Sequence, residues 1–357
     1  MTSLAELTTL RVGGPVDRVV DATTEAELVA AVREADRAGT PLLVLGGGSN
    51  LLAADEGFRG VVVRDRRRGV ERTEQDARAG ALVTVPAGQP WDEVVATAVA
   101  EGWRGLEALS GIPGSTGATP VQNVGAYGQE VGETLESVRV HDRLDGRTRT
   151  LTVGELGLGY RTSVLKRSLT DPRAGGGRTW GPTGRYVVLE VRFQLPLGTS
   201  SMPVRYAELA RSLDVELGAR VPAAEVREAV LALRRGKGMV LDEADHDTWS
   251  AGSFFTNPVL APDEADALLP PDAPRFPAPD GMVKTSAAWL ISRAGFDRGH
   301  GDPERAALSG KHVLALTNRG GARAADLVSL AREVRDGVRA RFGVALVPEP
   351  VLLGVEL

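Results

Sequence analysis

The sequence contains no cysteine and only four histidines among its 357 residues. The missing cysteines exclude disulfides, thiolate catalysis and cysteine-ligated metals, and they suit a reducing compartment. None of the histidines lies in a recognisable motif beside a serine, which argues against a hydrolase triad. The sequence therefore predicts neither a metal site nor a serine hydrolase.

An excess of positive charge is also missing, because 42 Lys and Arg face 47 Asp and Glu, a net charge of −5. This balance argues against a general nucleic-acid binder. The first residues carry Glu6 and no apolar core of signal-peptide length, so a cytoplasmic protein is predicted. Residues 108–129 lack any charge, but their prolines and five glycines are unlike a membrane span and favour a loop that meets a ligand.

The first third of the chain has patterns that alternate between strand and helix. Thr24 and Glu27 form a capping box at the start of a helix that Gly39 ends. Apolar periodicity and turn residues predict further helices at 90–102, 223–238 and 324–342, and strands at 41–45, 60–65, 81–88, 136–142, 147–152, 186–196 and 344–357. Residues 173–184 are interpreted as a flexible insertion, and residues 196–203, with prolines at both ends, as a domain boundary.

Two glycine-rich segments are candidates for ligand binding. "LGGGSN" (45–50) follows a buried strand, and its glycines would let backbone N–H groups approach a phosphate. It matches neither the dinucleotide fingerprint nor the P-loop, so an ordinary tight turn remains the alternative. Residues 105–132 hold seven glycines interleaved with apolar residues, which favours an ordered loop around a large cofactor over a disordered linker.

Polar residues elsewhere suggest an anion site and a proton donor. "GYRTSVLK" (159–166), Tyr206, Arg234 and Lys237 would together bind phosphates or a carboxylate, although each is by default a solvated surface residue. Ser253 in "AGSFFTNP" lacks the second glycine of a nucleophile elbow, and a structural turn serine is its alternative role. Glu349 lies in an apolar closing strand, where it is either partnered or exposed.

Taken in order, these motifs resemble the UDP-N-acetylenolpyruvoylglucosamine reductase family, also called UDP-N-acetylmuramate dehydrogenase. The resemblance covers nearly the whole chain, from "TTLRVGG" (8–14) through the segments above to "SGKHVLALTN" (309–318) and "VPEPV" (347–351). It implies an α+β fold with an FAD-binding domain of the p-cresol methylhydroxylase type, built from two α+β subdomains, and a C-terminal α+β substrate-binding domain. The expected bounds are 1–200, with subdomains at about 1–68 and 69–200, and 201–357, whose last strand returns Glu349 to the active site.

The resemblance also implies an activity. A cytoplasmic, monomeric flavoprotein would use FAD and NADPH to reduce UDP-N-acetylglucosamine enolpyruvate to UDP-N-acetylmuramate. This oxidoreductase step belongs to peptidoglycan precursor synthesis, and hence to cell-wall biogenesis, cell shape and cell division. The only partner expected is this small-molecule substrate, with no nucleic acid and no membrane.

Family roles carry over residue by residue. Hydride would come from flavin N5 and a proton from Ser253, while Arg161 and Glu349 would stabilise the intervening enolate. Substrate contacts fall on Tyr160, Tyr206, Lys237, Asn257 and His312. Cofactor contacts fall on Gly46, Gly47, Gly48, Ser49, Asn50, Leu51, Ser110, Gly111, Ile112, Pro113, Gly114, Ser115, Gly117, Ala118, Gln122, Asn123, Gly125, Ala126, Tyr127 and Gly128.

Two departures and two alternatives accompany this assignment. Residues 168–184 form a longer insertion than the family suggests, and Thr256 stands where many relatives carry lysine. One alternative is a non-covalent FAD-dependent sugar or alcohol oxidase of the same fold, although the first 140 residues hold no histidine for covalent attachment. The other is a non-catalytic nucleotide-sugar-binding flavoprotein, which the joint presence of Arg161, Ser253 and Glu349 disfavours.

Overall fold

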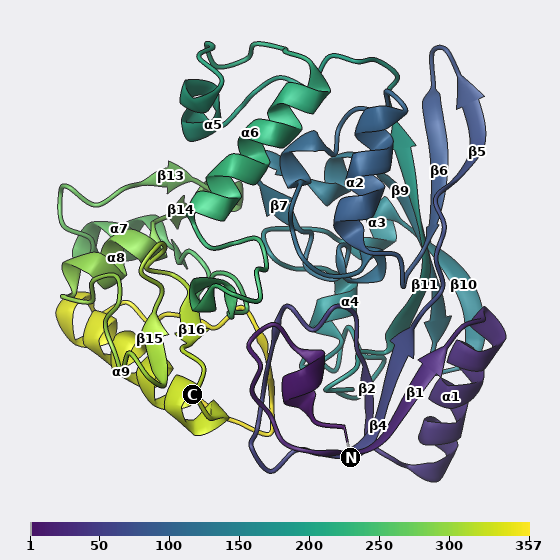
Figure 1. The fold of residues 1–357 in the computed structure, drawn as a ribbon, viewed down its shortest axis with the longest axis horizontal. Coiled ribbons are helices and arrows are strands. Elements are labelled where there is room, and N and C mark those ends of the chain that lie inside the picture. Colours follow the sequence, from purple (N-terminus) through teal and green to yellow (C-terminus); the bar gives the residue numbers. More distant parts are fainter. Residues whose placement is uncertain (1) are drawn as a thin grey trace. The chain divides into compact units, whose positions relative to one another are not determined.

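The computed structural model describes residues 2–357 and divides into two compact units. The larger unit consists of Val16–Gly47 and Arg59–Gly236, and the smaller unit of residues 2–15, Gly48–Phe58 and Lys237–Leu357. The chain therefore crosses between units within the first glycine-rich segment, between Gly47 and Gly48. In Figure 1 the purple start and the yellow end of the chain both belong to the smaller unit.

The first layer of the larger unit joins one helix to a small sheet. Its strands are β1 (Val16–Ala22), β2 (Leu42–Val44) and β4 (Phe58–Asp65), in the order β1-β4-β2 with β2 parallel to β4. Helix α1 (Glu25–Ala38) lies beside β1 (Figure 1) and begins with the predicted capping box of Thr24 and Glu27. Gly39 ends it in the left-handed conformation, φ 63°, which glycine adopts without steric cost.

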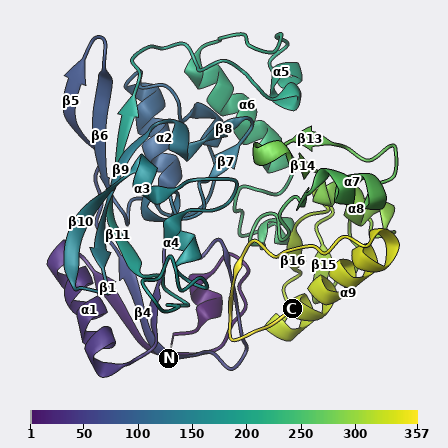
Figure 2. The ribbon, with the colours of Figure 1, turned by 180° about the vertical axis from the view of Figure 1, so that it is seen from behind.

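A five-stranded antiparallel sheet forms the second layer (Figure 2). Its order is β10-β9-β11-β6-β5, from β5 (Glu71–Asp76), β6 (Gly80–Pro86), β9 (Leu135–Asp142), β10 (Arg147–Thr152) and β11 (Tyr186–Leu195). Val187 and Leu189 of β11 share a core with α1, whereas Phe193 packs against Trp91 of α2 (Trp91–Ala100). Successive strand residues face opposite sides, and the register shift between Val188 and Glu190 turns Phe193 to the face opposite that of Val187 and Leu189, so β11 supplies two cores at once.

The remaining elements of the larger unit are short. They are η2 (Glu107–Leu109), η3 (Thr116–Ala118), β7 (Gly125–Ala126), β8 (Gln129–Glu130), η4 (Val131–Glu133), α3 (Val153–Leu156), α4 (Val164–Arg167), α5 (Ala207–Ser212) and α6 (Ala223–Gly236). Glu107 is buried and accepts hydrogen bonds from the backbone N–H groups of Gly105 (2.6 Å) and Met202 (2.5 Å). These bonds attach the stretch after 200 to the unit that contains β11.

The smaller unit packs around one long helix, α9 (Ala324–Phe342). Leu327, Ala331, Val334 and Val338, predicted to share one face, are all fully buried. Its other elements are η1 (Leu4–Leu7), β3 (Leu51–Ala53), η5 (His246–Thr248), β12 (Val259–Leu260), α7 (Pro262–Leu268), β13 (Phe276–Pro277), η6 (Pro279–Gly281), β14 (Val283–Lys284), α8 (Ala287–Arg293), β15 (Ala306–Leu308), β16 (Leu316–Asn318) and β17 (Val351–Leu353). Their sheets are β12-β14-β13, β15-β16 and β17-β3.

The predicted closing strand at 344–357 is much shorter in the structure. Only Val351–Leu353 forms a strand, which pairs in parallel with Leu51–Ala53. Pro348 and Pro350 have no backbone N–H to contribute to a ladder, so the pattern of apolar residues overestimated the strand.

The interpretation of residues 173–184 as a flexible insertion was wrong. Trp180 is buried, and its indole Nε1–H donates to the carbonyl of Gly175 at 2.7 Å. The guanidinium carbons of Arg143 and Arg178 lie 4.7 and 3.5 Å from the centre of its ring. The three consecutive glycines suggested mobility, but the tryptophan after them supplies a packed anchor.

Packing and the predicted domains divide the chain at different places. The unit boundary lies between Gly236 and Lys237, so residues 201–236 pack with the larger unit. The predicted boundary at 200/201 concerns which part binds which ligand, and it stays a prediction. Among residues 2–357, no helix is both long and apolar enough to cross a lipid bilayer.

His141 on β9 is a buried titratable group that no function explains. It is 1% exposed, and within residues 2–357 neither ring nitrogen has a hydrogen-bond partner. Burial lowers the pKa of His141 below its usual 6.5, and the positive charge of Arg33 on α1 lowers it further. The carboxylates of Asp36, Asp142 and Asp145 act in the opposite direction but do not outweigh these two effects.

A pH dependence of stability follows from this burial. Below about pH 6.5 the unfolded chain takes up a proton that the folded chain resists, so the wild-type protein loses stability as the pH falls. We expect His141→Leu to stabilise the protein by about 1 kcal/mol near neutral pH, because two unsatisfied nitrogens are removed. Urea unfolding should show a larger difference in the free energy of unfolding between variant and wild type at about pH 5.5 than at about pH 8. If this difference were the same at both pH values, the pH dependence would not come from His141.

Candidate active site

The two glycine-rich segments are in backbone contact within the larger unit. A Cβ atom at Gly46 would lie 2.5 Å from Oγ of Ser115, and one at Gly47 would lie 2.6 Å from Cα of Gly114. Neither position has room for a side chain. The turn after β2 therefore places bare backbone against the second segment, which the sequence alone did not show.

The second segment is an ordered loop held by the turn between β6 and α2. Gly117 N–H donates to the carbonyl of Ala87 (2.9 Å), and Thr116 N–H donates to that of Gln89 (2.8 Å). In the other direction, Trp91 N–H donates to the carbonyl of Gly114 at 3.0 Å. These bonds fix residues 114–117, so the alternative of a disordered linker is excluded.

Asp92 on α2 anchors the beginning of the same loop. Its carboxylate accepts a hydrogen bond from Gly111 N–H (2.6 Å) and a bidentate pair from Arg227 on α6 (2.6 and 2.8 Å). Burial alone would raise the pKa of Asp92, but the bonds from Arg227 and Gly111 outweigh it and the pKa is lowered. The carboxylate is therefore ionised at neutral pH and ties three elements together.

Three predicted site residues have a backbone conformation that side chains disfavour. Asn123, Tyr127 and Arg161 have φ angles of 45°, 49° and 54°. Each costs about 1–3 kcal/mol and persists only where the surrounding structure enforces it, as happens most often at functional sites. The sequence signalled none of these angles, because they follow from tertiary contacts.

Side-chain bonds show what enforces this conformation at Asn123. Its amide donates to Glu130 (2.7 Å) and to the carbonyl of Gly159 (3.3 Å), and its oxygen accepts from Gly132 N–H (3.0 Å). The side chain is buried, and these bonds give it a role inside the protein. Asn123 thus shapes the loop around it, whatever contact it makes with a cofactor.

The segment at 159–166 is attached to the second loop. Arg161 donates to the carbonyl of Gly125 (2.9 Å), and the hydroxyl of Ser163, the N-cap of α4, donates to the carbonyl of Val121 (2.6 Å). Lys166 adds a bond to the side-chain oxygen of Gln122 at 3.2 Å. The arginine predicted to stabilise an enolate is therefore held by the loop predicted to bind FAD.

Arg234, near the end of α6, was considered in the sequence but not assigned to the site. Burial lowers the pKa of its guanidinium, Tyr127 and Asp92 oppose that shift, and Arg161 adds to it. Arg161 and Arg234 are like charges close enough to interact, so together they form a local excess of positive potential suited to an anion. An arginine on an amphipathic helix is usually solvated, so the sequence gave no reason to assign Arg234 to the site, and only its surroundings in the fold do so.

Tyr127 and Tyr206 meet close to these arginines. Their rings are perpendicular with centroids 5.6 Å apart, and Tyr206, the N-cap of α5, is 45% exposed. Burial raises the pKa of Tyr127 to about 12. Its hydroxyl therefore stays protonated at neutral pH. Tyr160 is also exposed, with the guanidinium carbon of Arg161 5.8 Å from its ring centre.

In the smaller unit, the segments that carry Ser253 and Glu349 are paired. Glu349 N–H donates to the carbonyl of Phe254 (2.8 Å), and Thr256 N–H donates to that of Val347 (3.0 Å). Phe254 and Phe255 are 1% exposed and pack edge to face. The two buried rings directly follow Ser253 in the sequence. Together with the backbone bonds to the Glu349 segment, they fix the backbone at both residues, which are far apart in the sequence.

The other predicted residues of the smaller unit lie in defined surroundings. The side-chain oxygen of Asn257 accepts from Ala287 N–H at the start of α8 (3.0 Å). His312 is half-buried in the turn before β16, where its backbone N–H donates to the hydroxyl of Ser309. Lys237 follows α6 directly, and Leu51 in β3 pairs with Val351.

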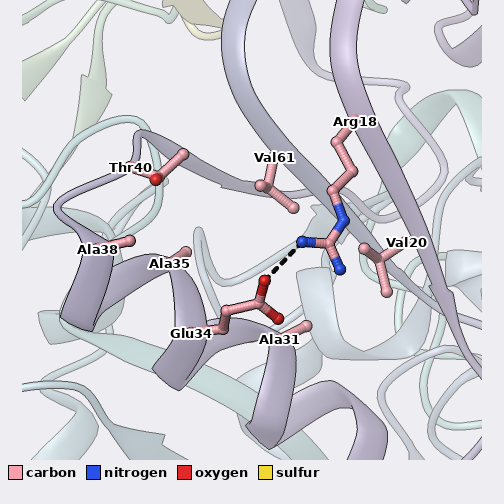
Figure 3. Close-up of a pocket in the computed structure, with 8 residues that line it drawn as sticks. All are labelled: Arg18, Val20, Ala31, Glu34, Ala35, Ala38, Thr40 and Val61. Atoms are coloured by element: carbon pink, nitrogen blue, oxygen red, sulfur yellow. Dashed lines mark hydrogen bonds and ion pairs between the residues drawn. The ribbon is translucent and has the colours of Figure 1, made fainter.

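A separate pocket in the larger unit contains no predicted site residue. It lies between α1, β1 and β4 and is lined by Arg18, Val20, Ala31, Glu34, Ala35, Ala38, Thr40 and Val61. Figure 3 shows the ion pair of Arg18 and Glu34 among them, at 2.6 Å. Both side chains are more than half exposed, so the pair contributes little to stability.

Known proteins similar to this chain identify its family. It is 58% identical to the UDP-N-acetylenolpyruvoylglucosamine reductase of Saccharopolyspora erythraea over 366 aligned positions, which cover 100% of this chain and 96% of that protein. The chain belongs to the UDP-N-acetylenolpyruvoylglucosamine reductase family. The Thermobifida fusca reductase agrees, at 54% identity over 99% of this chain and 97% of that one.

Two domain families and one solved structure support the same assignment and show which residues match each domain. Residues 243–353 match the C-terminal domain of UDP-N-acetylenolpyruvoylglucosamine reductase, and residues 16–152 match an FAD binding domain. The crystal structure of the Thermus caldophilus reductase superimposes with a TM-score of 0.63 at 28% identity, covering 99% of this chain and 97% of that one. The predicted α+β fold with an FAD-binding domain and a separate C-terminal domain is confirmed.

As a member of the reductase family, the chain is an FAD-dependent oxidoreductase of peptidoglycan precursor synthesis. The alternatives of a sugar or alcohol oxidase and of a non-catalytic flavoprotein are thereby set aside. The residues present fit FAD: two side-chain-free backbone segments in contact, at Gly46–Gly47 and Gly114, suit a pyrophosphate, and Arg161 and Arg234 supply positive charge.

Proposed function

We propose that the chain reduces UDP-N-acetylglucosamine enolpyruvate to UDP-N-acetylmuramate, with NADPH as the electron donor. The observation that carries the catalytic part is the pairing of the Ser253 and Glu349 segments through Phe254 and Glu349. It holds the backbone segments that carry a hydroxyl and a carboxyl group on one framework. An acid and a charge-stabilising group are what reduction of an enol ether requires.

FAD, when bound, would supply the hydride for one carbon of the enol ether. Negative charge then develops on the neighbouring carbon and its conjugated carboxylate. Arg161 stabilises that charge by hydrogen bonding, and its bond to the carbonyl of Gly125 orients the guanidinium in advance. Glu349, with its carboxyl group protonated, donates a second hydrogen bond to the same charge.

Ser253 completes the reaction by giving its hydroxyl proton to the carbanionic carbon. The product gains one hydride and one proton across the former double bond. Gly252 precedes Ser253 with a φ of 73°, and no atom lies within 4 Å of the position where a Cβ would point. Ser253 itself is only half-buried, which supports a hydroxyl that a substrate can reach.

Substrate contacts are proposed at Tyr160, Tyr206, Lys237, Asn257 and His312. Lysine and histidine suit the pyrophosphate of a UDP-sugar, and aromatic side chains suit its uracil and sugar rings. The bond from Ala287 N–H orients the amide of Asn257. We assign FAD binding to residues 1–200 and UDP-sugar binding to residues 201–357. We also propose that the protein is a cytoplasmic monomer, and light scattering would measure its mass in solution.

The test is an anaerobic absorbance titration of the purified protein. We expect a bound-flavin spectrum that NADPH bleaches and that UDP-N-acetylglucosamine enolpyruvate restores in stoichiometric amount. Flavin that recovers only when oxygen is admitted would overturn the proposed substrate. Bleaching by NADH but not by NADPH would overturn the proposed donor alone.

A further inference from the structure

Strand β2, which leads into the Gly46–Gly47 turn, lies at an edge of its sheet. Within residues 2–357 it pairs only with β4, through bonds such as Leu45 N–H to the carbonyl of Val63 at 2.9 Å. An edge strand presents backbone groups that need another partner. Val44 N–H finds one in the hydroxyl oxygen of Thr183, at 2.7 Å. Thr183 is buried and comes from the 168–184 insertion.

The backbone at Thr183 is itself fixed by Arg143. One guanidinium nitrogen of Arg143 donates to the carbonyls of Thr183 (2.6 Å) and Gly184 (3.2 Å), and another donates to the carboxylate of Asp36 on α1 (2.6 Å). The side chain of Arg143 is only 7% exposed, so these bonds are shielded from water. The same guanidinium stacks on Trp180, which anchors the middle of the insertion.

The start of the insertion is bonded to the second glycine-rich loop through α4. Ser168 is fully buried, donates to the carbonyl of Leu165 (2.8 Å) and accepts from Arg185 N–H (3.0 Å). Within the same short helix, Ser163 bonds to Val121 and Lys166 to Gln122. One continuous set of buried and part-buried bonds therefore runs from β2 through the insertion to residues 121–122.

We propose that residues 168–184 form a brace that positions both glycine-rich segments for FAD, with Thr183 as the positioning residue for the Gly46–Gly47 turn. The hydroxyl of Thr183 holds β2 two residues before Gly46, and that turn has no side chains to hold itself in place. The inference rests on the proposed function, since it takes these segments as the FAD site. It gives the longer insertion a role in cofactor affinity without a contact to the cofactor.

Isosteric variants separate positioning from bulk stability. Thr183→Val keeps the shape but leaves Val44 N–H without its acceptor, and we expect about tenfold weaker FAD binding to the apoprotein, measured by quenching of flavin fluorescence. Thr183→Ser restores the acceptor and should restore the affinity. Thr179→Val makes the same change at an exposed residue of the insertion and should leave the affinity unchanged. Wild-type affinity in Thr183→Val, or no rescue by serine, would overturn the proposal.

A measurement on the wild-type apoprotein keeps the proposal testable should Thr183→Val not fold. In hydrogen-exchange measurements, the amide of Val44 should be protected about as strongly as that of Leu45, which is bonded within the sheet. Rapid exchange at Val44 with protection at Leu45 would overturn the brace. A protein that binds no FAD but protects Val44 would contradict the function and leave the hydrogen bond intact, so the two failures are distinguishable.

Discussion

Ser253→Ala is expected to leave reduction of the flavin by NADPH unchanged and to slow its reoxidation by the enolpyruvyl UDP-sugar by about 10²- to 10⁴-fold. The reason is that a general acid acts only in the half-reaction that protonates the substrate carbon. Stopped-flow absorbance under anaerobic conditions follows the two half-reactions separately. Reoxidation at the wild-type rate would show that Ser253 is a structural turn serine, the alternative that the sequence left open.

The surroundings of Ser253 make this substitution a clean test. Phe254 and Phe255 are buried, and the backbone of Phe254 bonds to Leu314 (2.8 Å) and Glu349, so the turn does not depend on the serine hydroxyl for its shape. Ser292→Ala is the matched control, because it removes an exposed serine from α8 in the same unit. Both half-reactions should proceed in this control at wild-type rates.

Gly47→Ala is expected to weaken FAD binding by about 5- to 150-fold, corresponding to the 1–3 kcal/mol typical of overpacking. The added Cβ would lie 2.6 Å from Cα of Gly114, so the two glycine-rich segments have to separate. The neighbour is backbone, which cannot rotate out of the way as a side chain does. Titration of the apoprotein with FAD measures the loss, and circular dichroism checks that the variant folds.

Gly154→Ala is the matched control for this prediction. Gly154 lies in the short helix α3 of the same unit, and a Cβ there would meet nothing closer than the hydroxyl of Thr152, at 4.0 Å. Alanine also favours helical backbone over glycine. We therefore expect unchanged FAD affinity and equal or higher stability. Equal affinities for the two variants would show that the Gly46–Gly47 turn is only a tight turn and plays no part in holding FAD.

Elements defined by neighbouring residues were predicted well. The capping box of Thr24 and Glu27, the left-handed Gly39 and the apolar stripe of α9 are all present as expected. Each depends on side chains within a few positions, because capping bonds and helical periodicity are short-range. Where the local pattern misled, at 173–184 and 344–357, a single tryptophan or two prolines outweighed the glycine or apolar content around them.

By itself, the sequence determined the family, the candidate residues and most of the helices and strands, since motifs and periodicity are properties of adjacent positions. Only the tertiary structure decided which of these meet. It pairs the Ser253 and Glu349 segments, brings Arg234 within electrostatic reach of Arg161, and sets Thr183 against Val44. These contacts join residues distant along the chain, and they form only because burying apolar surface forces polar groups to find partners inside the fold.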